Sequence, residues 1–333
     1  MIYDFFYGVL NAHFSSLLSG IGAWFIVFMI GGLITINVPI FLGWVDRKLS
    51  GRIQARYGPV YTGPFGLLQN VADVIKLMGK RFITNQVIDP LIYNIVPIAI
   101  AMLGFLMVFI IPWGNAGLTL LFIPYNLLFI YIALAVSPLL VLLAGWGENN
   151  KYAMLGGFRG AAQITTYELS LLIVFISVAM LAGSYDISTI VSAQSGMWYV
   201  VYLPITLVVF GISSLAVIER GPFDIPEATQ ELQAGWKIEY SGIRYGLFFI
   251  AEYVRLLVIS MLIVYLFFGG WNGPLLPDYA WFWIKTIIVT FFMMSLRWVF
   301  NRPRIDQLIK IGFNWLLPLA VINLLIVGAV IFF

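Results

Sequence analysis

The feature that most constrains this chain is a series of apolar runs, each 18 or more residues long and almost free of charge. As an α-helix, a run of that length crosses about 30 Å of hydrocarbon, where only helices and closed barrels satisfy their own backbone polar groups. Of the 333 residues, 62% are hydrophobic and only 10% are charged, whereas a soluble domain carries about 25% charged residues. The sequence therefore predicts an all-α polytopic integral membrane protein.

The runs predict eight membrane-spanning helices in a single integral membrane domain, residues 1–333. Tryptophans stand near several of the predicted ends, as in the aromatic belts of membrane proteins. The predicted spans are 21–44, 91–113, 122–145, 162–183, 198–217, 244–268, 281–300 and 311–333.

Lysine and arginine are confined to alternate connections between these spans. Loops 45–90, 146–161, 218–244 and 301–310 carry all of the loop lysines and arginines, and the first 20 residues and the other three loops carry none. Because cytoplasmic loops are enriched in Lys and Arg, we predict that these four loops face the cytoplasm and that both termini face outward. The net charge of +3 then reflects topology and indicates no nucleic-acid partner.

Cysteine and histidine usage limits the chemistry that the chain can hold. The absence of cysteine excludes disulfides, cysteine-ligated iron–sulfur clusters and a thiol nucleophile. The single histidine, His13, is not enough for a metal site of the ordinary type, and we predict none. Without a nucleotide-binding motif, a self-contained active site is not expected either.

The most charged stretch is residues 217–242, VIERGPFDIPEATQELQAGWKIEYSG, which holds four of the seven glutamates. Asp224 and Glu227 have capping-box spacing and Pro226 suits a first helical turn, so we predict a short helix over 225–234. On such a helix Glu227 and Glu231 share one face. They are either solvated in a loop or, with few cations near them, able to exchange protons.

Ionisable residues inside the predicted spans are costly in lipid and usually mark ion pathways or ligand sites. Glu168 near the start of its span is the candidate for proton transfer, whereas Glu252 and Arg255 are spaced to pair with each other. Lys285 is expected to extend to the outer surface. A further amphipathic segment, 66–78 with Asp73 and Lys76, is expected to lie along the membrane interface.

Five segments together resemble the H-subunit (subunit 1) family of respiratory complex I (NADH-quinone oxidoreductase), in the same order along the chain. That family includes relatives in membrane-bound hydrogenases and methanogen-type dehydrogenases. The segments are GPFGLLQNVADVIKL (63–77), NNKYAMLGGFRGAAQITTYELSL (149–171), ERGPFDIPEATQEL with AGWKIEYSG (219–242), GLFFIAEY (246–253) and RPRIDQL (302–308).

The resemblance implies a subunit of a redox-driven proton or ion pump in the plasma membrane of a prokaryote. Its cytoplasmic loops would help to form the chamber of a quinone or methanophenazine-like carrier. Its partners would be peripheral-arm subunits that hold the terminal iron–sulfur cluster, small and antiporter-like membrane subunits, and lipids. The chamber and its gate would involve Arg52, Arg56, Asp73, Lys76, Arg220, Asp224 and Arg302, and proton coupling would involve Glu168, Glu219, Glu227, Glu231, Glu239 and Glu252.

Two departures from the family pattern leave alternatives open. Quinone-reducing members usually carry glutamate at the positions of Val217 and Arg81. Their loss favours a hydrogenase-type anchoring and coupling subunit without a carrier chamber, whereas Arg52, Arg56 and the segment from Gly63 favour the chamber. An independent transporter would need paired polar sites at the membrane midplane, and only Glu252 with Arg255 suggests one.

Overall fold

A computed structural model describes residues 2–11, 16–81, 85–115 and 118–332 of the chain. Every regular element within these ranges is helical, which confirms the predicted all-α class. His13 lies outside the described residues. The helices are α1 (Ile2–Asn11), α2 (Ser16–Ile53), η1 (Pro64–Gly66), α3 (Gln69–Gly79), α4 (Pro90–Ile110), α5 (Asn126–Ala135), α6 (Ser137–Gly147), α7 (Lys151–Ala182), α8 (Ile187–Ala193), α9 (Tyr199–Tyr202), α10 (Pro204–Val217), α11 (Thr229–Leu232), η2 (Gly235–Lys237), α12 (Ile243–Phe267), α13 (Asp278–Val299), α14 (Ile305–Ile311), η3 (Gly312–Leu316) and α15 (Leu317–Phe332).

Within the described ranges, seven helical stretches are long and apolar enough to cross a membrane, and each coincides with a predicted span. The remaining predicted span, 198–217, divides at Leu203 into α9 and the 14-residue α10. The division follows from Pro204, which lacks a backbone N–H and disfavours helical geometry in the residue before it. The count of eight membrane crossings therefore stays a prediction.

Proline also explains the break in the predicted span 122–145. The helix begins at Asn126 and is interrupted at Val136, so that it forms α5 and α6. Pro138 stands in the first turn of α6, where its missing N–H leaves the carbonyl one turn earlier without its helical partner. The two pieces still form one apolar stretch, Asn126–Gly147, that is long enough to span.

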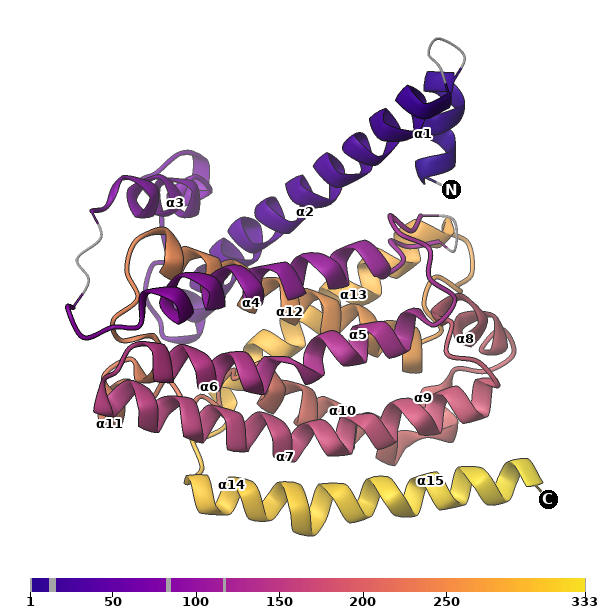
Figure 1. Ribbon diagram of the computed structural model, residues 1–333. Helices are drawn as coiled ribbons and strands as arrows, with labels where there is room; N and C mark the ends of the chain where they lie inside the picture. Colours follow the sequence, from indigo (N-terminus) through magenta and orange to yellow (C-terminus); the bar gives the residue numbers. More distant parts are fainter. Residues whose placement is uncertain (1, 12–15, 82–84, 116–117, 333) are drawn as a thin grey trace.

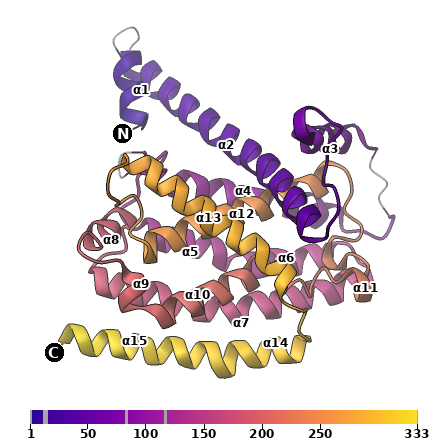
Figure 2. The same ribbon diagram turned by 180° about the vertical axis from the view of Figure 1, so that it is seen from behind.

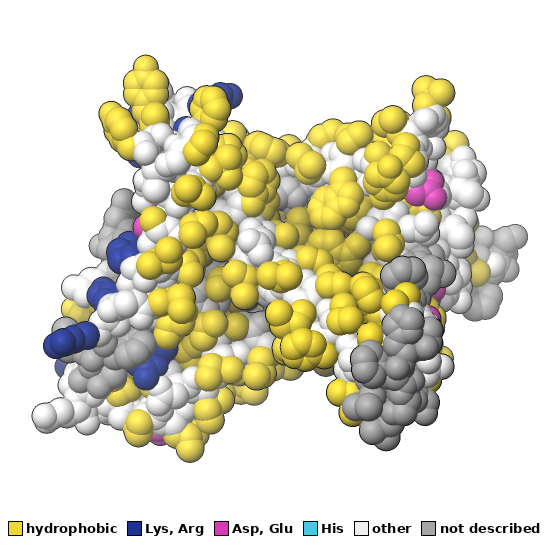
Figure 3. Space-filling model, turned by 90° about the horizontal axis from the view of Figure 1, so that it is seen from above, with side chains coloured by type: hydrophobic (Ala, Val, Ile, Leu, Met, Phe, Trp, Pro, Cys, Tyr) yellow, Lys and Arg dark blue, Asp and Glu magenta, His cyan; other side chains and the backbone are white. Residues whose placement is uncertain are grey.

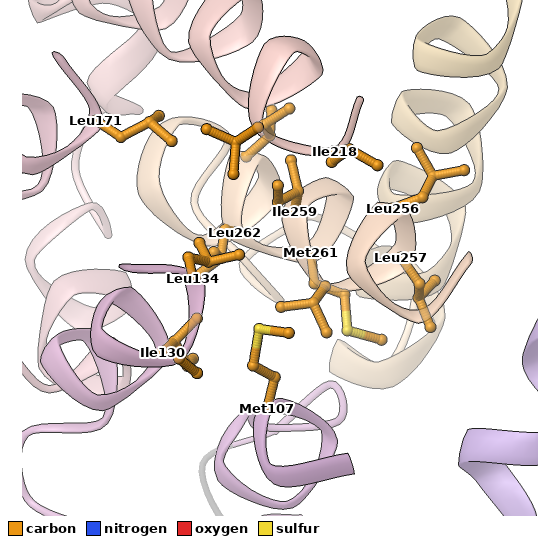
Figure 4. Close-up of a cluster of buried hydrophobic side chains, with 14 of the residues drawn as sticks. Met107, Ile130, Leu134, Leu171, Ile218, Leu256, Leu257, Ile259, Met261 and Leu262 are labelled. Carbon is orange, nitrogen blue, oxygen red and sulfur yellow. The ribbon is translucent and has the colours of Figure 1, made fainter. Parts of the chain in front are cut away.

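Helix α12 lies at the centre of the bundle. Its residues from Val254 to Phe267 are all buried, and a helix that is apolar all round is stable only where neighbours cover every side. Figure 4 shows Leu256, Leu257, Ile259, Met261 and Leu262 of this helix among side chains from α4, α5 and α7. The packed centre is built from helices far apart in the chain.

The two termini lie at one end of the molecule, and α3, α11 and the start of α14 lie at the other (Figures 1 and 2). Seen from above, lysine and arginine side chains gather at the left end, whereas hydrophobic side chains cover the middle (Figure 3). The structure thus brings the basic loops to one end, which agrees with the confinement of lysine and arginine to every second connection between the predicted spans. Which side of the membrane that end faces stays a prediction.

The predicted helix over 225–234 is wrong for most of its length. Only Thr229–Leu232 is α-helical, without a side-chain cap at its start, and Gly235–Lys237 adds one turn of 3-10 helix. The chain instead folds inward because it buries apolar residues, among them Ile225 and Trp236. Gly235 makes this path possible, since its φ is +57° and a Cβ there would lie 1.7 Å from the carbonyl oxygen of Pro226.

The segment predicted over 66–78 forms α3 from Gln69 to Gly79 and leaves Val71, Ile75 and Met78 exposed. Its place at the membrane interface stays a prediction.

Lys285 does not extend to the surface as expected. It is buried, and its Nζ donates to the carbonyl oxygens of residues 268, 270 and 272 at 2.7–3.1 Å, because the turn after α12 presents free carbonyls to it.

Candidate functional site

Ionisable side chains from α2, the 218–242 connection and α12, six of them buried and Glu227 and Glu252 partly exposed, form one group, which we call the buried charge cluster. Eight of its members come from segments up to about two hundred residues apart. They are Asp46, Glu219, Arg220, Glu227, Lys237, Glu252, Tyr253 and Arg255.

Arg220 is the centre of the cluster. Its Nη2 lies 3.2 Å from Asp46 Oδ2 and its Nε lies 3.1 Å from Glu252 Oε1, while its side chain is only 4% exposed. The guanidinium also lies 4.4 Å from the ring centre of Tyr253, whose hydroxyl donates to Asp46 Oδ2 at 2.9 Å. Burial alone would lower the pKa of Arg220, but the facing acids hold it above its ordinary value. Arg220 is therefore a fixed positive charge between two helices.

Lys237 is the second buried cation. Its Nζ contacts Glu227 Oε1 and lies 4.0 Å from Glu252 Oε2, so Glu252 is shared between Lys237 and Arg220. Burial would lower the pKa of Lys237, but Glu227 and its other acidic neighbours raise it. Burial also raises the pKa of Glu227 although Lys237 opposes this. The two residues form a desolvated ion pair.

Glu219 forms no ion pair with Arg220 or Lys237 within the described part of the chain. It is 5% exposed, and its Oε1 forms no hydrogen bond within the described part of the chain. Burial, reinforced by the charge of Glu227, raises its pKa to about 8. Burial and the charge of Glu227 therefore both favour the protonated form of Glu219.

The backbone at Glu219 is strained. Helix α10 ends in a Schellman motif, in which Arg220 N–H donates to Leu215 O and Glu219 N–H donates to Ala216 O. This motif places Glu219 in the left-handed region with φ +60°, a position that usually takes glycine. Strain of this kind is maintained by its surroundings and often accompanies function. Here it places Glu219 and Arg220 side by side in the interior.

Two predicted pairings are wrong. Glu252 bonds to Arg220 rather than to Arg255, whose Nε forms no hydrogen bond among the described residues. Glu227 and Glu231 also separate, because the helix that would align them does not form: Glu231 is exposed and lies 2.7 Å from Arg159. Glu231 therefore pairs with Arg159, whereas Glu227 and Glu252 both face Lys237.

The predicted chamber residues Arg52 and Arg56 do come together. They line a cavity of about 690 Å³ between the end of α2, the loop that follows it and α13. Lys48 is a third cation on its wall, and aromatic rings complete it. The cavity is lined by Trp44, Val45, Lys48, Leu49, Arg52, Ala55, Arg56, Tyr57, Gly58, Phe65 and Phe291.

The other predicted gate residues form two groups of ion pairs outside this cavity. Arg47 Nη1 lies 2.7 Å from Asp73 Oδ2, and Lys76 Nζ lies 3.3 Å from Asp73 Oδ1; burial opposes them, but they hold the pKa of Asp73 below its ordinary value. Arg302 Nη2 lies 2.9 Å from Asp224 Oδ2. Burial raises the pKa of Asp224 despite that partner.

The remaining predicted coupling residues, Glu168 and Glu239, lie apart from the buried charge cluster. Glu168 is buried within α7 and forms no hydrogen bond to a described residue. Glu239 accepts from the side chain of Asn150 at 2.9 Å and donates its backbone N–H to Glu148. Among the described residues, no ion pair or hydrogen bond joins either of them to Arg220 or Lys237.

A second cavity, of about 790 Å³, lies between α10, α12, α13, the connection before α14 and the last residue of α14, and its wall contains no charged side chain among the described residues. Leu207, Phe223 and Phe292 are typical of this wall. Such a surface suits hydrocarbon rather than a polar head group. In the described ranges we find no group of three or more acidic or histidine side chains that could hold a metal ion.

Sequence reasoning missed Asp46 and Tyr253 as members of the buried charge cluster, and it did not single out the buried Glu148. Asp46 is the first carboxylate after an apolar run of more than 25 residues, and its place at the end of a span was a signal for it. Tyr253 and Glu148 offered no comparable signal, since a tyrosine within a predicted span and a loop glutamate are both ordinary.

These features define a class: a polytopic membrane protein with a buried charge network at one end, beside a cation-lined cavity. The model of the NADH dehydrogenase family matches residues 25–328. The chain is 42% identical to NADH-quinone oxidoreductase H subunit 2 of Geobacter sulfurreducens, over 90% of this chain and 94% of that protein. It is 40% identical to the protein of the same name from Syntrophobacter fumaroxidans, over 88% and 91%, and 39% identical to that of Rhodopseudomonas palustris, over 91% and 98%.

The chain therefore belongs to the NADH dehydrogenase family, whose members include the H subunits of NADH-quinone oxidoreductase. This confirms the resemblance drawn from the five segments, and with the apolar helices it makes the chain a multi-pass membrane protein.

Proposed function

We propose that this chain is the membrane-anchor subunit of a complex I-type redox-driven proton or ion pump. In this proposal it forms part of the quinone chamber and couples quinone reduction to ion translocation. The observation that carries the proposal is the position of Asp46. It lies on α2 between Val45 and Lys48 of the cavity wall, while its carboxylate binds Arg220 and Tyr253 of the buried charge cluster.

The cavity supplies the chemistry that a quinone requires of this chain. Lys48, Arg52 and Arg56 offer positive charge to a head group that becomes anionic on reduction, and Trp44 and Phe65 offer ring faces. The chain has no cysteine, so iron–sulfur clusters belong to peripheral-arm partners, and electrons reach the quinone from outside this subunit. The same chamber would accept a methanophenazine-like carrier, which is also planar and apolar.

Coupling then follows from the shared cations. Lys48 lies two residues after Asp46 on α2, and a negative charge bound near Lys48 weakens the hold of Asp46 on Arg220. Arg220 and Lys237 both bind Glu252, so a shift of either cation changes the field at Glu219 and Glu227. Since buried carboxyl groups respond strongly to neighbouring charge, one of these residues takes up or releases a proton.

We assign the other predicted residues to the surroundings of this path. Asp73 with Lys76, and Asp224 with Arg302, are proposed to brace the chamber and its gate, whereas Glu168, Glu231 and Glu239 are proposed to serve proton coupling. We also propose that residues 1–333 form one domain in the plasma membrane of a prokaryote. Its partners would be small membrane subunits, antiporter-like subunits and lipids.

A second candidate function is a coupling and anchoring subunit of a hydrogenase-type complex that binds no carrier. The observation in its favour is the loss of two carboxylates that quinone-reducing members usually carry. Position 217 is a fully buried valine and position 81 is an exposed arginine. Glu219, two residues after Val217, puts a carboxyl group back into the same interior, which favours the first candidate.

The test is to purify the complex from its native membranes, extract and identify its lipophilic carrier, and compare it with the Arg52→Gln, Arg56→Gln double variant. We expect a stoichiometric quinone or methanophenazine in the original complex, and a rise of about tenfold or more in the KM for quinone in the variant because charge-assisted contacts are lost. Lys151→Gln, an exposed cation outside the cavity, is the matched control. A complex that holds no carrier and evolves hydrogen would exclude the chamber and support the second candidate.

A further inference from the structure

Glu148 is a buried acid that the proposed function has not used. It follows the last residue of α6 and precedes α7, outside the spanning helices, and only 1% of it is exposed. Its Oε2 accepts a hydrogen bond from the backbone N–H of Glu239 at 3.2 Å. Its Oε1 is buried and forms no hydrogen bond within the described part of the chain. A carboxylate in that state would be incompletely solvated.

Other polar groups beside the Glu239 backbone have free hydrogen-bonding capacity. The hydroxyl groups of Tyr240 and Ser241 are buried and have no hydrogen-bond partner among the described residues. Tyr240 stacks on Tyr93 with ring centres 4.4 Å apart, and the Tyr93 hydroxyl donates to the backbone oxygen of Glu239 at 2.8 Å. Glu148 thus belongs to a buried polar group whose hydrogen-bonding capacity is only partly used.

The charged groups around Glu148 do not neutralise it. Glu239 is the adjacent acid and is bound by Asn150; on the α4 side Asp89 caps its own helix, and α12 contributes Arg244, whose guanidinium lies 4.9 Å from the ring centre of Tyr93. None of the ion pairs seen in the described residues includes Glu148. Burial raises the pKa of Glu148 to about 9, and the charge of Glu239 adds to this although its N–H opposes it.

We propose that Glu148 is a proton-holding residue of the pump, which gives its proton to Glu239 and is reprotonated once in each turnover. In this step the O–H bond of the Glu148 acid breaks and an O–H bond forms on the Glu239 carboxylate, with no electron transferred. The Tyr240 hydroxyl stabilises the Glu148 carboxylate while it is charged. This inference rests on the proposed function, because an acid that releases and regains a proton in each turnover has a role here only if the complex is a pump.

The first test is infrared difference spectroscopy of the assembled complex across a pH titration. We expect the carbonyl-stretch band of a protonated carboxylic acid, lost in Glu148→Gln and titrating near pH 9 in the original complex. Asp306→Asn removes an exposed acid in the first turn of α14 and is the matched control, which should leave the band unchanged. A band that survives in Glu148→Gln overturns the assignment.

The second test counts protons translocated per electron pair in membrane vesicles. We expect Glu148→Gln to lose about half or more of the translocated protons while quinone reduction continues, and Glu148→Asp to retain translocation with an altered pH profile. If Glu148→Gln does not assemble, an unaltered pH profile in Glu148→Asp overturns the proposal. An original complex without translocation would refute the proposed function itself, whereas full translocation by Glu148→Gln would refute only the role of Glu148.

Discussion

At the scale of single residues, Arg220 shows why the buried charge cluster acts as a unit. One guanidinium compensates Asp46 from α2 and Glu252 from α12. Removing one partner of a buried ion pair typically costs about 3 to 5 kcal/mol, because the remaining charge is left desolvated. Such a cluster contributes little net stability compared with apolar packing, and the role that we propose for it is charge movement.

Glu219 gives the residue-scale prediction on pH. Its pKa is raised from 4.5 to about 8, so between these values the folded state holds a proton that the unfolded state has lost. The contribution of Glu219 to stability is therefore fully present below 4.5 and is lost as the pH rises toward about 8. Glu219→Gln should flatten this fall, and thermal denaturation of the purified complex at a series of pH values measures it.

The matched control is Glu231→Gln, which removes a carboxylate that is 61% exposed and lies far from full burial. In this variant, thermal stability should change with pH as steeply as it does in the original complex. If Glu219→Gln and Glu231→Gln give the same slope as the original complex, Glu219 is not protonated in the folded state near neutral pH.

At the scale of elements, the path of the connection 218–242 is set by residues with unusual backbone conformations rather than by helix propensity. Glu219, Gln233 and Gly235 have positive φ values, which no regular helix allows, and along this irregular path Lys237 is buried against Glu227. A regular helix over 225–234 would have placed Glu227 and Glu231 on one face. Burial of Trp236, whose side chain is fully enclosed, outweighs the local helix signals.

Gly235→Ala tests that account. A Cβ at this position would lie 1.7 Å from the Pro226 oxygen, at a φ of +57°, so the segment must shift and move Lys237 away from Glu227. We expect a loss of stability of about 2 kcal/mol or more, typical of strain at a special backbone position, together with impaired ion translocation. Thermal denaturation and the proton count measure both.

Gly196→Ala provides the comparison, because a Cβ there meets nothing within 4 Å. It should behave as the original complex does in both measurements. Equal stability of the two alanine variants would mean that Gly235 is not required for the inward path.

At the scale of the whole molecule, the fold sorts charge along one axis. The described ends of the chain lie at one end, and α3, α11 and the start of α14 lie at the other, where exposed lysine and arginine side chains gather (Figures 1 and 3). The cavity at Arg52 and the buried charge cluster both lie among the basic connections. A carrier reduced at this end would therefore meet the network that responds to its charge.

The predicted orientation can be tested directly because the chain has no cysteine. Single substitutions Lys151→Cys, in a basic loop, and Gly196→Cys, at the opposite end, should react with a membrane-impermeant maleimide from opposite sides of sealed membranes. We expect Lys151→Cys to be labelled only from the cytoplasmic side and Gly196→Cys only from outside. Labelling of both variants from the same side would contradict the topology.

The sequence by itself determined the class of the protein, the position of seven apolar helices and the family, because apolar length and local motifs are properties of contiguous residues. It also grouped Arg52 with Arg56 through the family resemblance, and both line one cavity, whose role as a carrier chamber stays a prediction. It did not determine how the charges pair: Glu252 was expected to bind Arg255 and instead binds Arg220, and Asp46 was not expected at all.

Only the tertiary structure decided those pairings, since Asp46 and Arg220 are 174 residues apart and meet only when α2 packs against α12. The same is true of Glu148 and Glu239, which are 91 residues apart. A buried charge takes the partner that packing brings within reach, because desolvation makes an unpaired charge more costly than any local preference of the chain.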